Sequence, residues 1–250
     1  MKTSNKFLLI AAVFTLLSLG VYDLFLNAAY RSGNYADPYK DYIQLDFKDF
    51  DNLDLPSSTA ANVKIIQGPF SVRIDENARS FVQVGQEGSD LVINASFDGN
   101  YRTTSNQYIL LISCPKLSEV NANAGYQANN MKVTDTIVRD DWNMRQILIE
   151  GFKMDSLHIT QDYGSTVVLA NNHIRAISAV VGKSRGSGSY LIIQDNNEFS
   201  NADLDIQNNS KLFLNNAKIQ NLNYQLGDKS KLIVTGKAKN LLNKLKPEQK

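Results

Sequence analysis

Residues 204–234 read LDIQNNSKLFLNNAKIQNLNYQLGDKSKLIV and contain two copies of one short pattern. In each copy, apolar residues alternate with polar ones, a polar turn follows, and a serine precedes a second alternating run. The copies span Leu204–Leu214 and Leu222–Val234, with Ser210 and Ser230 after the turns. Alternation with a period of two is typical of half-buried β-strands. Each copy therefore predicts a strand, a turn and a second strand.

Two further copies precede this stretch. One pairs Leu157-x-Ile159 with Val167-x-Leu169, and a longer one pairs Ile177-x-Ala179 with Leu191–Ile193. The unit of roughly 18 to 27 residues is too small to bury its own apolar side chains, so stacked units would line one continuous interior. We predict an all-β fold, a right-handed parallel β-helix or β-solenoid over residues 47–236, behind an N-terminal hydrophobic helix. A β-sandwich is the alternative, and the near-constant repeat after residue 154 favours the solenoid.

Asparagine pairs are typical of the corners that such a chain needs, because asparagine tolerates the left-handed backbone of tight turns. Pairs begin at five positions: Asn129, Asn171, Asn196, Asn208 and Asn215. Many turns are therefore expected.

Shorter alternating runs precede the repeat. They are Val63–Ile74, Val82-x-Val84, Leu91–Ile93 and Ile109–Val120. Together these runs resemble the GIN-domain family of bacterial envelope proteins, described as adhesin head domains. The resemblance covers residues 47–236 and implies a β-helical fold, an envelope location and an adhesin-like or surface-structural role. It implies no catalytic residue.

The N-terminal segment predicts export. Lys2 and Lys6 precede an uncharged stretch from Phe7 to Tyr22, which is typical of a signal or membrane-anchor segment over residues 1–30. If it is not cleaved, residues 7–29 would cross the membrane with the N-terminus in the cytoplasm. The body would then face the periplasm from the inner membrane, or be secreted after cleavage. Residues 31–46 read as a linker.

The composition argues against several classes of function. Twenty-six Lys and Arg residues nearly balance 25 Asp and Glu residues, so we expect no nucleic-acid partner. The single Cys114 and the two histidines, His158 and His173, match no metal-binding spacing, so we expect no metal and no cofactor. Cys114 lies in an apolar run, and we expect it to be buried.

Two flanking segments have a structural interpretation. Aspartates in residues 37–54 could bind calcium, but the stretch lacks the EF-hand pattern, and a solvated face is the favoured interpretation. Phe50 and Leu53 alternate with these aspartates, which predicts an edge strand or strap over the start of the body. The lysine-rich residues 237–250 predict a short helix that caps the last repeat.

The candidate binding residues lie on the outward face of the repeat. If Leu204 points inward, Asp203 and Asp205 point outward. Asp203 would then share a column with Ser156, Ala176 and Asn221, and Asp205 would share a second column with His158, Ser178 and Asn223. Trp142 stands in a charged insertion and is a candidate contact residue. Several tyrosines could stack on sugars, although core or turn packing is the alternative for each: Tyr101, Tyr108, Tyr126, Tyr163 and Tyr190.

These residues form no convincing catalytic site, because two carboxylates alone supply no base beside a nucleophile. We therefore predict a non-enzymatic envelope module with an adhesin-like or structural interaction role and a protein or glycan partner. A polysaccharide-binding or polysaccharide-cleaving protein that uses the outward acidic residues is the alternative.

Overall fold

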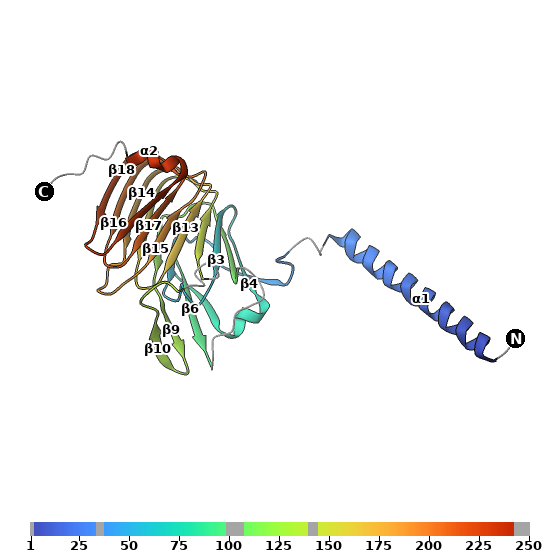
Figure 1. The fold of residues 1–250 in the computed structure, drawn as a ribbon. Coiled ribbons are helices and arrows are strands. Elements are labelled where there is room, and N and C mark those ends of the chain that lie inside the picture. The colour runs from blue at the N-terminus through green and yellow to red at the C-terminus, as the bar shows by residue number, and fades with distance from the viewer. Residues whose placement is uncertain (1–2, 34–37, 99–107, 140–144, 243–250) are drawn as a thin grey trace. The chain divides into compact units, whose positions relative to one another are not determined.

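The computed structural model describes residues 3–33, 38–98, 108–139 and 145–242 (Figure 1). It divides into two compact units, Met1–Tyr42 and Ile43–Lys250. The first unit holds helix α1 (Thr3–Ser32). The second unit, called the body below, holds two β-sheets.

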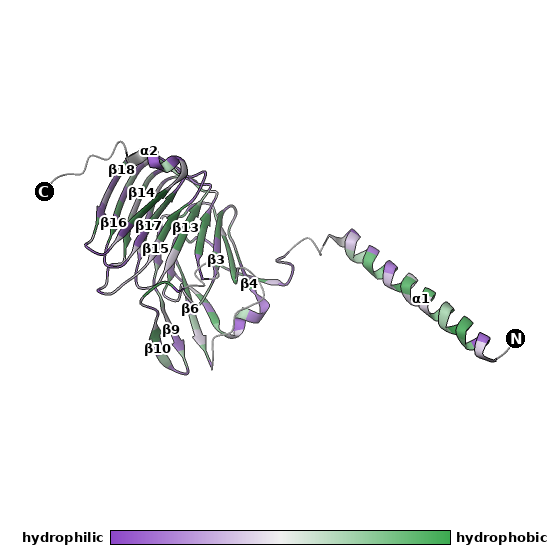
Figure 2. Ribbon diagram, in the orientation of Figure 1, coloured by the Kyte–Doolittle hydropathy of each residue, from purple (hydrophilic) through white to green (hydrophobic). Residues whose placement is uncertain are grey.

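Helix α1 is apolar along most of its length (Figure 2). The segment Thr3–Arg31 is long and apolar enough to cross a membrane, and its most apolar stretch is not buried within the structure. A bilayer core requires about 20 mostly apolar residues in a helix. By length and composition, α1 therefore fits either a membrane anchor or a signal sequence.

Sheet A contains nine strands within the described residues. In spatial order they are β1 (Tyr42–Leu45), β4 (Ser71–Asp75), β7 (Leu110–Cys114), β3 (Val63–Gln67), β11 (Ile147–Glu150), β13 (Thr166–Ala170), β15 (Tyr190–Ile193), β17 (Lys211–Asn215) and β19 (Lys231–Thr235). The first of these strands falls inside residues 31–46, which the sequence suggested as a linker.

Sheet B contains ten strands in the same described part of the chain. In spatial order they are β10 (Met131–Thr134), β9 (Gly125–Ala128), β6 (Asp90–Phe97), β2 (Asn52–Leu55), β8 (Glu119–Ala122), β12 (Lys153–Gln161), β14 (His173–Val181), β16 (Glu198–Ile206) and β18 (Lys218–Leu226), and β5 (Val82–Glu87) pairs with β6. A short 3-10 helix, η1 (Glu76–Ser80), connects β4 to β5.

The prediction of a right-handed parallel β-helix is wrong. The body consists of two multi-stranded mixed sheets, because antiparallel pairs β4–β7, β5–β6 and β9–β10 interrupt the parallel ones. In addition, β3 lies between β7 and β11, so the order of strands in space does not follow the chain. The repeat that suggested a solenoid covers only the second half of the body. Alternating side chains show which face of a strand is buried, but they do not show which strand lies beside it.

The strands predicted from the repeat are present beyond Ile147. From β11 onward the chain alternates between the two sheets, and each strand pairs in parallel with the previous strand of its own sheet. Equivalent apolar residues form inward-facing lines, which are Val167, Leu191, Leu212 and Leu232 in sheet A, and Leu157, Ile177, Ala202 and Leu222 in sheet B. Both sheets contribute to one hydrophobic core.

Asparagines turn many of the corners, as predicted. Every asparagine pair contributes at least one residue in the left-handed conformation. Four pairs contribute one residue each, Asn171, Asn196, Asn208 and Asn216, and the fifth pair contributes both Asn129 and Asn130. Their φ angles lie between 51° and 61°. Only glycine and asparagine adopt this backbone at little cost.

Two further structural expectations have mixed outcomes. Cys114 is fully buried in the core, as predicted. Phe50, Leu53 and Leu55 are buried as well, but β2 is not an edge strand, because β6 and β8 pair with it on either side. The apolar alternation of this stretch therefore identified a strand and missed its central place.

A short helical segment follows the last strand. It consists of a 3-10 helix, η3 (Gly236–Ala238), and the first turn of α2 (Lys239–Leu242). Ala238 is buried, and the backbone N of Lys237 donates to Asn216 Oδ1 at 2.8 Å. The predicted helix therefore begins here, and the rest of residues 237–250 lies outside the described residues.

Candidate functional site

The outer face of sheet B carries a line of polar side chains. Strands β8, β12, β14, β16 and β18 lie side by side in register, so that equivalent residues are aligned across the strands. One such line, called the polar row below, consists of Glu119, His158, Ser178, Asp203 and Asn223. Alternate residues of a strand point to opposite faces, and the flanking Leu157 and Leu204 are buried. The polar row therefore faces outward.

Hydrogen bonds connect neighbours within the polar row. The Nδ1 atom of His158 lies 2.8 Å from Ser178 Oγ, and its Nε2 atom lies 3.4 Å from Thr160 Oγ1. Asn223 Nδ2 donates to Asp203 Oδ1 at 2.9 Å. These bonds hold the side chains in fixed positions along the face.

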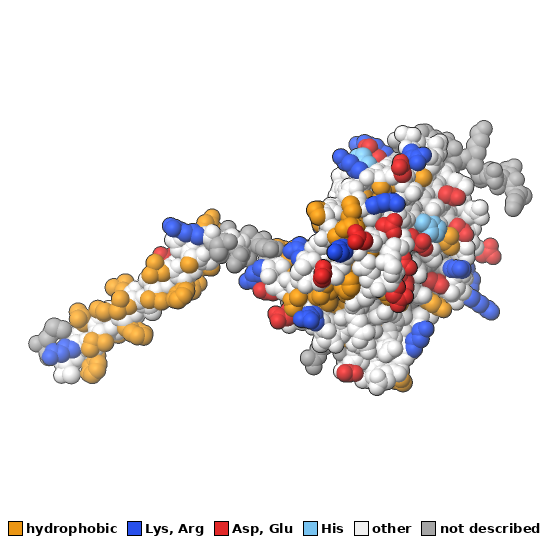
Figure 3. Space-filling model, turned by 180° about the vertical axis from the view of Figure 1, so that it is seen from behind, with side chains coloured by type: hydrophobic (Ala, Val, Ile, Leu, Met, Phe, Trp, Pro, Cys, Tyr) orange, Lys and Arg blue, Asp and Glu red, His pale blue; other side chains and the backbone are white. Residues whose placement is uncertain are grey.

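Four of the five residues of the polar row, all except Glu119, line a hollow of about 840 Å³. A parallel line of side chains also borders this hollow, and there Asn221 Nδ2 donates to Asn201 Oδ1 at 3.0 Å. Acidic side chains and both histidines are visible on one face of the body (Figure 3). The hollow is open and has both polar and apolar lining residues, and its hydrogen-bonding groups repeat from strand to strand.

The structure brings two of the four predicted site residues together. Asp203 and His158 both line the hollow, with Ser178 between them in the polar row. Asp205 belongs to the next line of sheet B, does not line this hollow, and accepts a hydrogen bond from Gln207 Nε2 at 2.6 Å. Trp142 lies outside the described residues.

The predicted columns are shifted by two residues in β16. The sequence pattern aligned Asp203 with Ser156, but Asp203 is in line with Ser178 and His158. Asp205 is in line with Thr160 through the intervening Val180. A shift of two residues leaves the same side chains facing outward, so the hydrophobic pattern cannot detect it.

Sequence reasoning missed the acidic residues that extend this face. Glu119 pairs with Asn52 of β2 as well as with His158, and Asn52 Nδ2 donates to Asp90 Oδ1 at 2.8 Å. Their strands precede the repeat, so no repeated pattern pointed to them. Only the strand order of sheet B places them beside the polar row.

Asp54 lies on the same face, and burial raises the pKa of its carboxyl group. The hydrogen bond from Asn121 Nδ2 opposes this shift, whereas nearby carboxylates, Asp90 first among them, add to it. Partial desolvation and like charge both disfavour the ionised form.

A second hollow, of about 720 Å³, lies further along the same strands. The Glu198 carboxylate binds Lys218 Nζ, and its Oε2 atom lies 3.5 Å from His173 Nε2. The hydrogen bond from Lys218 lowers the pKa of Glu198. This hollow is therefore bordered by lysine, arginine and glutamate side chains, whereas the polar row contains no lysine or arginine.

Comparisons with known proteins do not assign the chain to a family. No protein-family model matches the chain and no curated protein matches it by sequence, so the resemblance to the GIN-domain family stays a prediction. Its fold is similar to that of a "putative adhesin" from Bacteroides fragilis, at 13% identity and a TM-score of 0.39, covering 79% of this chain and 99% of that one.

Two other solved structures are also similar. A "putative adhesin" from Parabacteroides distasonis has 8% identity and a TM-score of 0.30, covering 77% of this chain and 96% of the other. A "putative lipid binding protein" from the same species has 12% identity and a TM-score of 0.24, and the match covers 78% of this chain and 96% of the other. Such low values do not transfer a function.

The polar row contains a serine beside a histidine, which is the pair that nucleophilic hydrolases use. Hydrolysis of an acyl group also requires preorganised N–H donors for the developing oxyanion. Ser178 lies in the central strand β14, which pairs with β12 on one side and with β16 on the other. Its backbone N–H groups are therefore used within the sheet.

Metal binding finds no ready ligand set on this face. Among the described residues, no group of three or more His, Cys, Asp or Glu side chains is placed to hold a metal ion. The hydrogen-bonding groups of the polar row can instead donate to and accept from a bound polar partner.

Proposed function

We propose that the chain is a membrane-tethered, non-enzymatic interaction module of the cell envelope, with an adhesin-like or structural role. The observation that carries this proposal is the polar row, which extends over five strands and in which hydrogen bonds join His158 to Ser178 and Asn223 to Asp203. An ordered, repetitive face on a rigid sheet can recognise a partner without losing much side-chain entropy.

Helix α1 supports the tether. Its apolar length is sufficient for one membrane crossing, and Lys6 lies near its N-terminal end. The positive-inside rule favours a cytoplasmic N-terminus and a body on the outer side of the inner membrane. If the helix is instead a cleaved signal, the same body is secreted.

The alternative function is polysaccharide binding or cleavage. It is favoured by the position of Asp203 in the hollow, beside Ser178 and near His158. Cleavage of a glycosidic bond would need a second carboxyl group opposite the first across the substrate. Asp205 does not border this hollow, so recognition of a polysaccharide is the stronger form of this alternative.

The tether is tested with alkaline phosphatase fused to the C-terminus of the full chain. We expect an active, membrane-bound fusion, because this enzyme matures only outside the cytoplasm. Replacing Leu16 and Leu17 with lysine should abolish membrane insertion, since charges at the centre of a span are costly. Replacing both with isoleucine is the matched control. A full-length fusion that is found in the membrane but has no phosphatase activity would contradict the proposed orientation.

The recognition role is tested on the full-length protein with isolated cell envelopes, a glycan array and a reducing-sugar assay. Specific binding without release of reducing ends supports the module, and release of reducing ends would replace it with the enzyme. The double variant Asp203→Asn and Asp205→Asn should weaken binding. Asp228→Asn, in an exposed turn, is the matched control. Equal binding by all three proteins would exclude Asp203 and Asp205 as contacts.

A further inference from the structure

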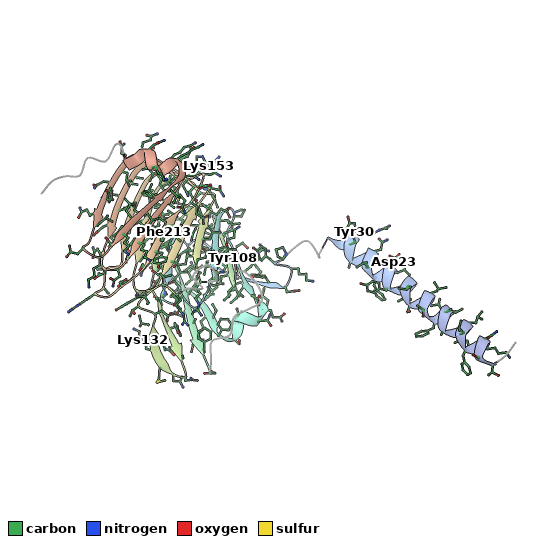
Figure 4. All side chains as sticks on the ribbon, in the orientation of Figure 1. Asp23, Tyr30, Tyr108, Lys132, Lys153 and Phe213 are labelled. Carbon is green, nitrogen blue, oxygen red and sulfur yellow. The ribbon has the colours of Figure 1, made fainter. Side chains whose placement is uncertain are left out.

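A third hollow, of about 550 Å³, lies beside the β9–β10 hairpin. It is called the hairpin cleft below, and its lining includes Asn94, Ser96, Gln127, Lys132, Thr134 and Tyr163. The first five of these residues come from β6, β9 and β10, and Tyr163 follows β12. Figure 4 shows Lys132 on the hairpin. The cleft is separate from the polar row and shares no lining residue with its hollow.

The register of the strands aligns the polar residues of the cleft. Ser96 pairs with Gln127, and Gln127 pairs with Lys132 across the hairpin. Asn94 lies two residues before Ser96 on the same strand, and therefore on the same face. Amide, hydroxyl and ammonium groups thus line one wall of the cleft.

These side chains differ from the polar row because they lack partners. Within the described residues, the side chains of Asn94, Gln127 and Lys132 make no hydrogen bond or ion pair to protein groups. In the polar row, by contrast, Asn223 is already bonded to Asp203. The side chains of Asn94, Gln127 and Lys132 are therefore free to bind a ligand, whereas Ser57 and Asn123 of the same lining are already hydrogen-bonded.

Tyr163, which lines the cleft, is in an unusual backbone conformation. Its φ angle is 51°, in the left-handed region, where a bulky residue is strained. The strand register aligns Gln161 with Ile206 through Val181 of the strand between them. Tyr163 and Asn208 each lie two residues further along, so they occupy equivalent positions, and the φ of Asn208 is 55°. Asparagine tolerates this conformation far better, so folding alone does not explain the tyrosine.

The Tyr163 side chain also has no structural partner among the residues described. Its backbone is held by other groups: its carbonyl oxygen accepts from Ser189 Oγ at 2.7 Å, and its N donates to Asp162 Oδ1 at 2.9 Å. Its ring forms no aromatic pair and its hydroxyl no hydrogen bond within the described part of the chain. The half-buried ring is therefore available to a ligand in the cleft.

From this combination we infer that the hairpin cleft binds an oligosaccharide, with Tyr163 as the surface against which a sugar ring packs. Sugar hydroxyls both donate and accept hydrogen bonds, and amide and hydroxyl side chains match them in both respects. A tyrosine ring offers the flat apolar face that such a ring needs. An extended peptide would instead add to a free strand edge, whereas these groups lie on the face of the sheet.

Glycine at position 125 permits a steric test. A β-carbon there would lie 3.7 Å from the Pro56 carbonyl oxygen and 3.9 Å from Lys132 Cε, which is ordinary contact distance. Gly125→Leu should therefore fill the cleft without straining the backbone. Gly85, on the neighbouring β5, has open space around its position, so Gly85→Leu is the matched control.

The experiment measures binding of the full-length protein to cellohexaose, maltohexaose and chitohexaose by isothermal titration calorimetry. We expect at least one of them to bind. Tyr163→Asn and Gly125→Leu should each weaken that binding by about tenfold or more, as is typical for loss of a central contact. Tyr163→Asn should leave the thermal unfolding midpoint unchanged or raise it, because asparagine suits this turn. Gly85→Leu should bind as the unmodified protein does, and Asn223→Ala, in the polar row, distinguishes binding on that row from binding in the cleft.

The inference is overturned if none of the three oligosaccharides binds. It is also overturned if binding survives both cleft variants, or if Asn223→Ala weakens it as much as they do. The last result would place a sugar on the polar row and would support the alternative function instead. Membrane topology and envelope binding through the polar row are measured separately, so the proposed function can stand or fall without the hairpin cleft.

Discussion

Asn197 repeats, one unit later in the chain, the hydrogen bonds of Asn172. Asn197 Oδ1 accepts from the backbone N of Asn172 at 3.1 Å, as Asn172 Oδ1 accepts from the backbone N of Phe152 at 2.9 Å. Each Nδ2 also donates to a carbonyl oxygen, that of Leu169 or Ile149. Both asparagines are fully buried, so this ladder satisfies backbone groups that water cannot reach.

Asn197→Ala should therefore destabilise the body by about 1–3 kcal/mol, because buried backbone groups lose their partners. The free energy of unfolding is measured by urea denaturation. Asn201→Ala removes an asparagine from the exposed face of sheet B and should change stability by less than about 0.5 kcal/mol. Equal losses in the two variants would show that the buried ladder has no special role.

Gly182→Ala should destabilise the body more than an ordinary surface substitution. Gly182 has a φ of 79°, which costs a residue with a side chain about 1–2 kcal/mol. Its new β-carbon would also collide with Ser210 Oγ and lie 2.7 Å from the carbonyl oxygen of Gln207. Thermal denaturation measures the effect, with Gly85→Ala as the control. A wild-type melting temperature for Gly182→Ala would contradict the close packing of this corner.

Cys114 should resist thiol reagents in the folded protein. Burial, with a smaller effect of Asp51, raises the pKa of its thiol to about 12, so almost no reactive thiolate forms at pH 8. Since the chain has one cysteine, labelling by a colourimetric disulfide reagent reports on this site alone. We expect negligible reaction before denaturation and one equivalent after it. Rapid labelling of the folded chain would disprove the burial.

The same shift predicts a loss of stability in alkali. Because the folded pKa is raised above the unfolded value, the thiol favours the folded state below about pH 8.5, and stability falls as pH rises toward 12. Cys114→Ala should reduce that loss in urea denaturation between about pH 8 and pH 10. An identical pH dependence in both proteins would contradict the assignment.

Asp54→Asn should stabilise the body at neutral pH. Burial raises the folded pKa of Asp54, so its contribution to stability is fully present below about pH 4 and is lost as pH rises through the folded pKa. Asparagine keeps an acceptor for Asn121 and removes the charge. We expect a gain below about 1 kcal/mol at pH 7 and none near pH 3, measured by urea denaturation. A variant that is less stable at pH 7 would show that the charge is needed.

Much of the local structure could be predicted from the sequence. The apolar N-terminal helix, the alternating strands after Ile147 and the asparagine corners follow from side-chain pattern and backbone preference, which are local properties. The sheet topology could not. The pairing of β9 with β6 and the insertion of β3 between β7 and β11 depend on contacts between distant segments, and no periodicity records them.

The candidate site was predicted in part for the same reason. His158 and Asp203 were recognised as outward polar residues, whereas their true alignment through Ser178 and the addition of Glu119 required the strand register. The unusual backbone of Tyr163 was equally hidden, since its equivalence to Asn208 becomes visible only when the strands are paired.

By itself, then, the sequence determined which residues face inward, where the chain turns and that an apolar helix precedes the body. The tertiary structure alone decided which strands are neighbours, how far each slides along the next, and which polar side chains meet. The physical reason is that a strand shifted by two residues buries the same face, so the hydrophobic effect favours both registers and only specific contacts between strands choose one.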